Sequence, residues 1–364
     1  MIKIIHFGIH NTENKNSGDT VLFKLTQKLF NTFQSNIEWT NKNLWEPIDQ
    51  EDIKKINLNF DYLLIGGGGL LLRDQKGAEN SISGWQFNCS TELIKKISIP
   101  VIVFGIGYNR FRRQDDFLDV FKENINALIK KSIFFGLRNN GSIKKLKEYL
   151  TPENSKKISL QHCPTVILDL IENVKTKPIN KIEKISINFA YDRPKNRFID
   201  ENLILKETSL FIKFLIERDY KIDICLHKEV DMIIMGYLDN FSKEKINIVD
   251  LSIKGYNDII TYYKNIDLAI GMRGHSQMIP FGISKNIISI ISHDKLGYFL
   301  EDVNLSEYGI DVDDMNFFNN LRNVFIKIEN KFNYQLSQIH DQKEIIYMNT
   351  KKNIEKIFDN VQEI

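Results

Sequence analysis

The sequence predicts an α/β protein built from two doubly wound domains and a helical tail. Short apolar runs close on glycine or a polar loop and alternate with amphipathic helical patterns along most of the 364 residues. The alternation pauses in a charged, apolar-poor segment over 172–184, which we interpret as a linker, and then restarts. Because the strand runs are continuously apolar, each sheet should be parallel and covered by helices on both faces.

The first domain is predicted over residues 1–175. Its apolar strand runs lie at 2–8, 61–69, 100–107 and 132–138. A helical pattern over 20–33 follows the first run, with Asp19 or Thr20 as its N-cap. Another helical pattern follows the fourth run, with Ser142 as its cap.

The second domain is predicted over residues 180–312 and the helical tail over 313–364. Strand runs in the second domain lie at 185–193, 221–227, 246–252, 267–273 and 285–293. Helical patterns between them lie at 207–220, 229–241 and 256–264. The tail reads as charged amphipathic helix with a weaker middle.

The composition excludes several classes of protein. The 49 basic and 47 acidic residues leave a net charge of +2, so the one-sided basic excess of a nucleic-acid-binding protein is missing. Three cysteines lie far apart without a CxxC pair, which argues against a disulfide framework and a thiolate zinc site. No run approaches the roughly 20 apolar residues of a membrane span, and the N-terminal run is too brief for a signal peptide. We therefore expect a cytoplasmic protein without a metal, able to contact the inner face of a membrane through a surface patch.

Glycines gather where two strand runs of the first domain end. In doubly wound sheets, ligands bind beyond the carboxyl ends of the strands. The second run ends in Gly66–Gly69 and the third in Gly105-x-Gly107. Each adjacent glycine costs about 1 kcal/mol relative to alanine, so the run indicates either close approach of a ligand or chain, or an amide nest for an anion. It matches neither GxGxxG nor GxxxxGK[ST], which disfavours dinucleotide and nucleoside-triphosphate binding.

Cationic side chains also follow the strand runs. Arg138 and Arg193 end two of them, and Lys295 follows a third. Each arginine can fork onto the carboxylate or phosphate of a ligand, or pair with a neighbouring acid. Lys295 can contact an anion or face solvent.

The segment GMRGHSQMIPFG, residues 271–282, carries the most specific candidate site. It places Arg273 and His275 at a strand end or helix start, so both point at the space that the amides of that helix face. Histidine titrates near neutrality and can carry a proton into a reaction. We therefore predict that this segment binds an anion and transfers a proton.

These motifs, in this order, resemble those of the polysaccharide pyruvyl transferases. The set consists of NSGD, IGGGG, FGIG, GLR…S and GMRGHSQMIPFG…IISHDK, and the resemblance covers roughly residues 10–300. It implies two Rossmann-like domains facing a cleft, similar to the GT-B glycosyltransferases. It also implies transfer of a pyruvyl group from phosphoenolpyruvate, as co-substrate, to a sugar, forming a pyruvate ketal and releasing phosphate without a cofactor or metal.

The resemblance also assigns roles to the candidate residues. It implies that His275 and Arg273 are catalytic, His275 as proton donor and Arg273 as anion clamp. We expect donor binding by Arg138, Arg193, Ser276 and Lys295, and acceptor binding by Asp19, Gly67, Gly68, Gly69 and Gly107. The chain departs from the family pattern at Asn139, where aspartate is usual, at the Cys-Pro-Thr of 163–165, where an aspartate–proline pair is common, and at Gly274, where leucine is frequent.

Other functions fit the same pattern of residues. One is a GT-B glycosyltransferase that uses a nucleotide sugar, and another is a non-catalytic sugar- or phosphate-binding protein of a capsule or cell-wall assembly. A nicotinamide oxidoreductase is disfavoured because no GxGxxG with a downstream acid is present. The acceptor sugar can be free, nucleotide-linked or lipid-linked.

Overall fold

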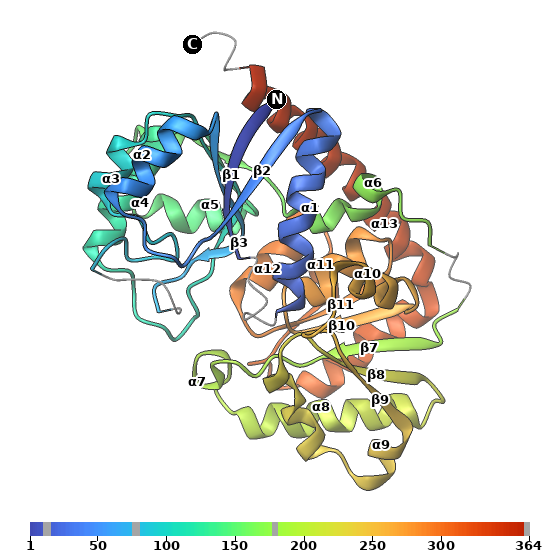
Figure 1. Cartoon of the computed structure of the whole chain (residues 1–364). Helices are drawn as coiled ribbons and strands as arrows, with labels where there is room; N and C mark the ends of the chain where they lie inside the picture. The colour runs from blue at the N-terminus through green and yellow to red at the C-terminus, as the bar shows by residue number, and fades with distance from the viewer. Residues whose placement is uncertain (10–15, 75–80, 177–180, 360–364) are drawn as a thin grey trace.

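The computed structural model of the chain describes residues 1–9, 16–74, 81–176 and 181–359. Residues 177–180 of the predicted linker and 360–364 of the predicted tail lie outside the described residues, as does the 10–15 part of the first strand-to-helix connection. Two six-stranded parallel sheets with flanking helices make up the molecule, and a long C-terminal helix follows them (Figure 1). The predicted α/β fold with a helical tail is confirmed.

The first sheet has the strand order β2-β1-β3-β4-β5-β6. Its strands are β1 (Ile2–Gly8), β2 (Ile37–Asn43), β3 (Tyr62–Leu71), β4 (Val101–Tyr108), β5 (Ser132–Leu137) and β6 (Ile158–Leu160). The helices that accompany it are α1 (Ser17–Phe33), α2 (Gln50–Asn59), α3 (Thr91–Lys96), α4 (Asp119–Lys131), α5 (Asn140–Lys147), η2 (Asn154–Lys156), η3 (Pro164–Ile167) and α6 (Leu168–Glu172). The central strands are buried along their length, as their continuous apolar sequence requires.

The second sheet has the order β12-β11-β10-β7-β8-β9. Its strands are β7 (Lys184–Asn188), β8 (Lys221–Leu226), β9 (Ile246–Asp250), β10 (Leu268–Gly271), β11 (Asn286–Ile291) and β12 (Gly309–Asp311). Its helices are α7 (Pro194–Arg197), α8 (Glu201–Ile216), η4 (Glu229–Tyr237), α9 (Asn240–Lys245), α10 (Tyr256–Lys264), α11 (His275–Gly282), α12 (Asp294–Asp302) and η5 (Ser306–Tyr308). Counted from β7, this is the 3-2-1-4-5-6 order of the Rossmann fold.

The strand order reverses once in each sheet, and the two reversal points face each other. In the first sheet the reversal lies between β1 and β3, and in the second between β7 and β10. Doubly wound sheets bind ligands beyond the strand ends at such points. One cleft is lined by residues that follow all four of these strands, from Ile9 after β1 to Arg273 after β10.

Helix α13 (Phe317–Asp359) joins the two halves of the molecule (Figure 1). Its first part buries Phe317, Leu321 and Phe325 in the core of the second sheet. Its last turns bury Ile354 and Ile357 against strands of the first sheet. The helix is interrupted by non-helical backbone at Lys331, in the region where the sequence pattern weakens.

The loop after β4 forms further contacts between the two halves. Arg112 binds Asp311 through Nη1 at 2.9 Å and Nη2 at 2.6 Å, and Asp294 through Nε at 2.5 Å. Arg113 binds Asp313 at 2.7 Å. These arginines thus pair with acids in and next to β12 and α12 of the second half.

Several local predictions need correction. Helix α1 begins at Ser17, because Asn16 and neither Asp19 nor Thr20 caps it, with its side-chain oxygen accepting from the Gly18 amide at 3.1 Å. Helix α5 is capped by Asn139, whose side chain accepts from the Ser142 amide.

The predicted helix over 229–241 is a 3-10 helix over Glu229–Tyr237 followed by α9. The helix predicted over 207–220 instead spans Glu201–Ile216, because Asp200 caps it six residues earlier.

Candidate functional site

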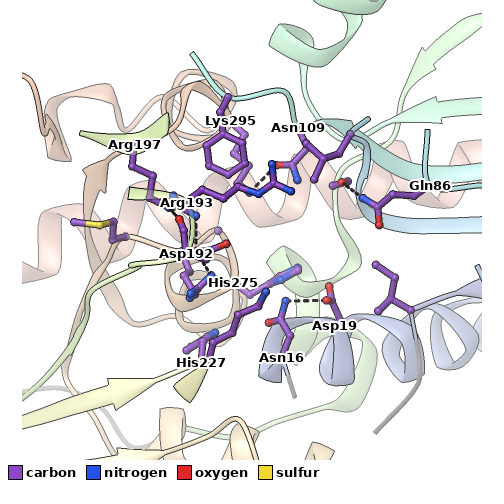
Figure 2. Close-up of a pocket in the computed structure, with 18 of the residues that line it drawn as sticks. Asn16, Asp19, Gln86, Asn109, Asp192, Arg193, Arg197, His227, His275 and Lys295 are labelled. Carbon is purple, nitrogen blue, oxygen red and sulfur yellow. Dashed lines mark hydrogen bonds and ion pairs between the residues drawn. The ribbon is translucent and has the colours of Figure 1, made fainter. Parts of the chain in front are cut away.

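Side chains from both halves of the molecule converge on the cleft between the two reversal points (Figure 2). The cleft encloses about 860 Å³, including space open to solvent. Of the residues predicted from the sequence, those that line it are Asp19, Gly69, Arg138, Arg193, Arg273, His275 and Lys295. The cleft therefore collects the arginine and histidine of residues 271–282 together with cations from three other strand ends.

Arg273 is bound on its charged end by two carboxylates. Its Nε and Nη2 contact the two oxygens of Asp231 at 2.8 Å and 2.5 Å, and its Nη1 lies 2.9 Å from Asp192. Burial disfavours the charged guanidinium, but Asp192 and Asp231 outweigh it and raise the pKa of Arg273. This geometry already pairs the charge of Arg273 twice, and its predicted role as a clamp for a ligand anion stays a prediction.

The backbone around Arg273 is held by short polar side chains. The Arg273 amide donates to Asn188 Oδ1 at 3.1 Å and to Ser276 Oγ at 3.2 Å, and the Ser276 hydroxyl donates to the Arg273 carbonyl at 2.8 Å. Ser276 is buried and is absent from the residues that line the cleft. The structure thus places Ser276 as a support of the turn rather than as a ligand-facing hydroxyl.

Asp192 lies between two arginines. In addition to Arg273, Arg197 contacts it through Nη2 at 2.9 Å and through Nε to its carbonyl at 2.7 Å. Burial alone would favour the protonated acid, but Arg273, Arg197 and more distant lysines hold the pKa of Asp192 well below its usual range. Asp192 is thus an ionised carboxylate in the wall of the cleft.

Arg138, Lys295 and His275, which we call the Arg138 cluster, line the cleft, and the Asp19 carboxylate is near enough to Arg138 to attract its charge. Among the described residues neither Arg138 nor Lys295 forms an ion pair. Arg138 is only 5% exposed, and its Nε and Nη2 have no hydrogen-bond partner in the described part of the chain. Lys295 donates to the side-chain oxygen of Asn109 at 2.7 Å. A buried, unpaired guanidinium is costly, so this cluster is arranged for an anion that the protein itself does not supply.

The pKa values of the cluster shift in the direction expected of crowded positive groups. Burial lowers the pKa of Arg138. Burial, followed by repulsion from Arg138 and Arg197, lowers the pKa of Lys295 well below its usual range. Burial, followed by repulsion from Arg138, His227 and Lys295, does the same to His275. Perturbed groups that meet in a cleft in this way mark functional sites.

His275 begins α11 and is enclosed on two sides. A Cβ on Gly18 would lie 2.2 Å from His275 Nδ1, so only glycine fits at the start of α1 beside the imidazole. On the other side, Cys163 Sγ lies 3.6 Å from His275 Nε2. Cys163 belongs to the Cys-Pro-Thr segment that departs from the family pattern, and the structure brings this departure into direct contact with the histidine.

The four glycines predicted to bind the acceptor differ in whether they line the cleft. Among Gly67, Gly68, Gly69 and Gly107, all of them described, only Gly69 lines the cleft. A Cβ on Gly107 would meet Arg138 Nε at 2.1 Å, and a Cβ on Gly67 would meet Leu22 at 3.3 Å. Gly67, Gly68 and Gly107 do not line this cleft and allow close packing of side chains and of α1, so the prediction that they face an acceptor stays a prediction.

Arg193 spans the cleft. Its Nη1 contacts Asp74 of the other half at 2.5 Å, its Nη2 donates to the Asp74 carbonyl at 3.1 Å, and its guanidinium lies over Phe111. Arg193 also has left-handed backbone, with φ at 60°. This arginine is therefore engaged in a contact between the two halves.

Sequence reasoning missed several residues of the cleft. These are Asn16, Trp45, Gln86, Asn109, Asp192, His227 and Lys228. A usable signal existed for Asn109 and His227, because His227 ends a predicted strand and Asn109 lies two residues after one. His227 is buried, and its Nδ1 has no hydrogen-bond partner among the described residues. Burial, followed by repulsion from Arg273, lowers the pKa of His227 to about 3.

The described residues contain neither a metal-binding cluster nor a membrane-spanning helix. No group of three or more histidine, cysteine, aspartate or glutamate side chains suited to a metal ion occurs within residues 1–9, 16–74, 81–176 and 181–359. Over the same residues, no helix combines the length and apolar character needed to cross a membrane.

Comparison with known proteins agrees with this architecture. A family model described as polysaccharide pyruvyl transferase matches residues 14–294 of the chain. In a comparison with curated protein sequences, none matches.

Among solved structures, Staphylococcus aureus MnaA with UDP is similar with a TM-score of 0.57 and 13% identity, covering 100% of this chain and 96% of that one. The UDP-GlcNAc 2-epimerase of Methanocaldococcus jannaschii, in complex with UDP-GlcNAc and UDP, is similar with a TM-score of 0.52 and 15% identity, covering 91% of this chain and 93% of that one. These neighbours have the GT-B fold, so the predicted GT-B-like architecture is confirmed.

Proposed function

Because the chain belongs to the polysaccharide pyruvyl transferase family, we propose that it transfers a pyruvyl group from phosphoenolpyruvate to a sugar. The acceptor would be a sugar of a cell-surface polysaccharide, such as a capsule or cell-wall polymer, or a nucleotide- or lipid-linked precursor. The product would be a pyruvate ketal, with phosphate released. The reaction would take place in the cytoplasm, where phosphoenolpyruvate is made, and at the inner face of the membrane if the acceptor is lipid-linked.

The observation that carries this proposal is the unpaired Arg138 cluster. Phosphoenolpyruvate bears a carboxylate and a phosphate on the same carbon, so its site needs several cations close together. Arg138 and Lys295 offer such charges on one cleft, and neither has an ion-pair partner among the described residues. A fork-shaped guanidinium suits the carboxylate or phosphate, and Lys295 adds a point charge.

His275 is suited to deliver the proton that starts the reaction. In the empty cleft its pKa is held well below the usual range by burial and by Arg138, His227 and Lys295. A bound trianionic donor reverses the sign of the local potential, so it raises the pKa of His275 and favours the protonated imidazole. The histidine then becomes an acid only when the donor is in place.

The reaction balances with these groups. His275 protonates the methylene carbon of phosphoenolpyruvate, and a sugar hydroxyl attacks the cationic carbon that results while losing its proton. The carbon–oxygen bond to phosphate then breaks, and a second hydroxyl of the same sugar attacks and loses its proton, which closes the ketal. The proton of the first hydroxyl returns to His275 and that of the second leaves with the phosphate as hydrogen phosphate, so one phosphate leaves for each ketal formed. Alignment of hydroxyl and donor in the cleft supplies the entropic part of the acceleration.

Asp19 and Arg273 have supporting roles in this proposal. Asp19, which accepts from Asn16 Nδ2 at 2.8 Å, lies on the cleft wall opposite α11 and can accept a hydrogen bond from a sugar hydroxyl. Arg273 fixes the ionised Asp192 and the turn that carries His275. We therefore treat Arg273 as a positioning residue that acts through Asp192 and His275.

The test is incubation of the protein with phosphoenolpyruvate and a panel of free, nucleotide-linked and lipid-linked sugars. We expect phosphate release that depends on one acceptor, and a mass increase of that acceptor by one pyruvate ketal. His275→Gln should abolish both signals. Turnover of a nucleotide sugar without phosphate release from phosphoenolpyruvate would instead identify a glycosyltransferase. Binding without either turnover would identify a non-catalytic binding protein.

A further inference from the structure

Trp45 lines the cleft, and the proposed reaction assigns it no role so far. It follows the edge strand β2, and its amide donates to Asn43 Oδ1 at 3.1 Å. Its indole N–H donates to Gln86 Oε1 at 2.9 Å. These two hydrogen bonds fix the orientation of a half-buried indole whose remaining surface lines the cleft.

The other two tryptophans have different surroundings. Trp85 is fully buried and contacts the ring of Phe87, and Trp39 contacts the rings of Phe30 and His6. No aromatic partner of the Trp45 ring is found within the described residues. Trp45 is therefore the tryptophan that presents an aromatic surface to a ligand.

A short chain of contacts connects Trp45 to the Arg138 cluster. Gln86 Nε2 donates to the Gly69 carbonyl at 3.1 Å. A Cβ on Gly69 would lie 2.7 Å from the side chain of Asn109, so Gly69 and Asn109 are in close contact. Asn109 Oδ1 accepts from Lys295 Nζ at 2.7 Å. A ligand on Trp45 would thus lie beside whatever Lys295 binds.

The wall around Trp45 has the chemistry of a carbohydrate site. Gln86, which contacts Trp45, and Asn16 and Asp19, which line the cleft on the same half, are neutral or acidic, whereas of the cleft's cations Arg138 lies on this half and Arg193, Arg197, Lys228, Arg273 and Lys295 lie on the other. A sugar ring has an apolar C–H face and a rim of hydroxyls, which matches an aromatic surface edged by carboxylate and amide groups. The cleft thus separates a cationic end, suited to an anion, from a neutral end, suited to a sugar.

We propose that Trp45, oriented by Gln86, is the platform of the acceptor subsite and stacks on the pyranose ring that receives the pyruvyl group. Asp19 and Asn16 then bind hydroxyls at the edge of that ring. This inference rests on the proposed function, because it takes the Arg138 cluster as the donor site. It adds to that function the place and the mode of binding of the acceptor.

The experiment uses the full chain and saturation-transfer difference NMR with methyl glycosides of glucose, galactose, mannose and N-acetylglucosamine as probes. We expect the wild type to bind at least one probe, and Trp45→Ala to weaken its binding by about tenfold or more. Trp45→Phe, which keeps an aromatic face, should retain most of the binding. Trp39→Phe, a change within β2 and away from the cleft, should leave it unaltered, and thermal unfolding checks that each variant is folded.

Calorimetric titration of the same variants with phosphoenolpyruvate separates the two proposals. Trp45→Ala should bind phosphoenolpyruvate as the wild type does. The subsite is refuted if no probe binds the wild type, or if Trp45→Ala binds the probes unchanged. Sugar binding that depends on Trp45, in a protein that does not bind phosphoenolpyruvate, would uphold the subsite and overturn the proposed donor.

Discussion

Both carboxylate oxygens of Asp231 bind the guanidinium of Arg273, at 2.5 Å and 2.8 Å, in the interior of the second domain. Removal of one member of such a buried pair leaves an uncompensated charge. We predict that Asp231→Ala lowers the free energy of unfolding by about 3 kcal/mol, measured by urea denaturation. Lys181→Ala, which breaks an exposed pair with Glu183, is the control and should leave stability unaltered; equal stability of the Asp231 variant would contradict the pairing.

The contact between Gly18 and His275 predicts an unusual effect of a small substitution. Gly18→Ala places a methyl group 2.2 Å from the present position of His275 Nδ1, so the imidazole must move. We expect at least a hundredfold loss of turnover, in line with the cost of a displacement of about 1 Å at a reacting group, in a protein that still binds phosphoenolpyruvate. Gly236→Ala, where the added methyl meets open space, is the matched control. Full activity of the Gly18 variant would show that His275 does not act from this position.

We expect Lys295 to lower the free energy of unfolding while it serves to bind the donor anion. Burial is the chief cause that lowers the pKa of Lys295 well below its usual range. Lys295 therefore binds its proton more tightly in the unfolded chain than in the folded protein. Replacing it by methionine removes this cost, and we expect Lys295→Met to raise the free energy of unfolding at pH 7. The same variant should lose phosphoenolpyruvate-dependent phosphate release. A destabilised Lys295→Met protein would show that the lysine is a structural group.

The lowered pKa of His227 makes the free energy of unfolding depend on pH. Its folded-state pKa is about 3, below that of an unfolded histidine, so between these two values the unfolded state binds more protons. Stability contributed by neutral His227 is therefore present above about pH 6.5 and is lost as pH falls toward 3. Between pH 8 and pH 5 this group alone removes about 2 kcal/mol. Urea unfolding of wild type and His227→Gln at both pH values should show a flatter dependence for the variant, and parallel curves would contradict the shift.

The strands could be predicted from the sequence because burial on both faces requires uninterrupted apolar runs, as in β3 and β4. Strand β2 was not predicted, because Ile37–Asn43 is an edge strand whose sequence alternates with polar, exposed residues. The edge strands β6 and β12 were not predicted either, because three residues are too few for an apolar run. The predicted domain and linker boundaries at 175, 180 and 312 stay predictions.

The site was predicted only in part, for a different reason. Strand-end position was enough to select Arg138, His275 and Lys295. The partners of Arg273 lie in the segments that follow two other strands, 42 residues away at Asp231 after β8 and 81 residues away at Asp192 after β7, and only the folded sheet brings them together. Gly107 was assigned to a ligand because sequence cannot tell a glycine that faces a cleft from one that accommodates Arg138.

The central claim is that the unpaired Arg138 guanidinium binds the donor anion. Calorimetric titration of the whole protein with phosphoenolpyruvate tests it most directly, with Arg138→Gln as the variant and Arg322→Ala, a change on α13 outside the cleft, as the control. Loss of a charge-assisted bidentate contact should weaken binding by about tenfold to a hundredfold, while Arg322→Ala binds as the wild type does. Unchanged phosphoenolpyruvate affinity in a folded Arg138→Gln protein would contradict the account.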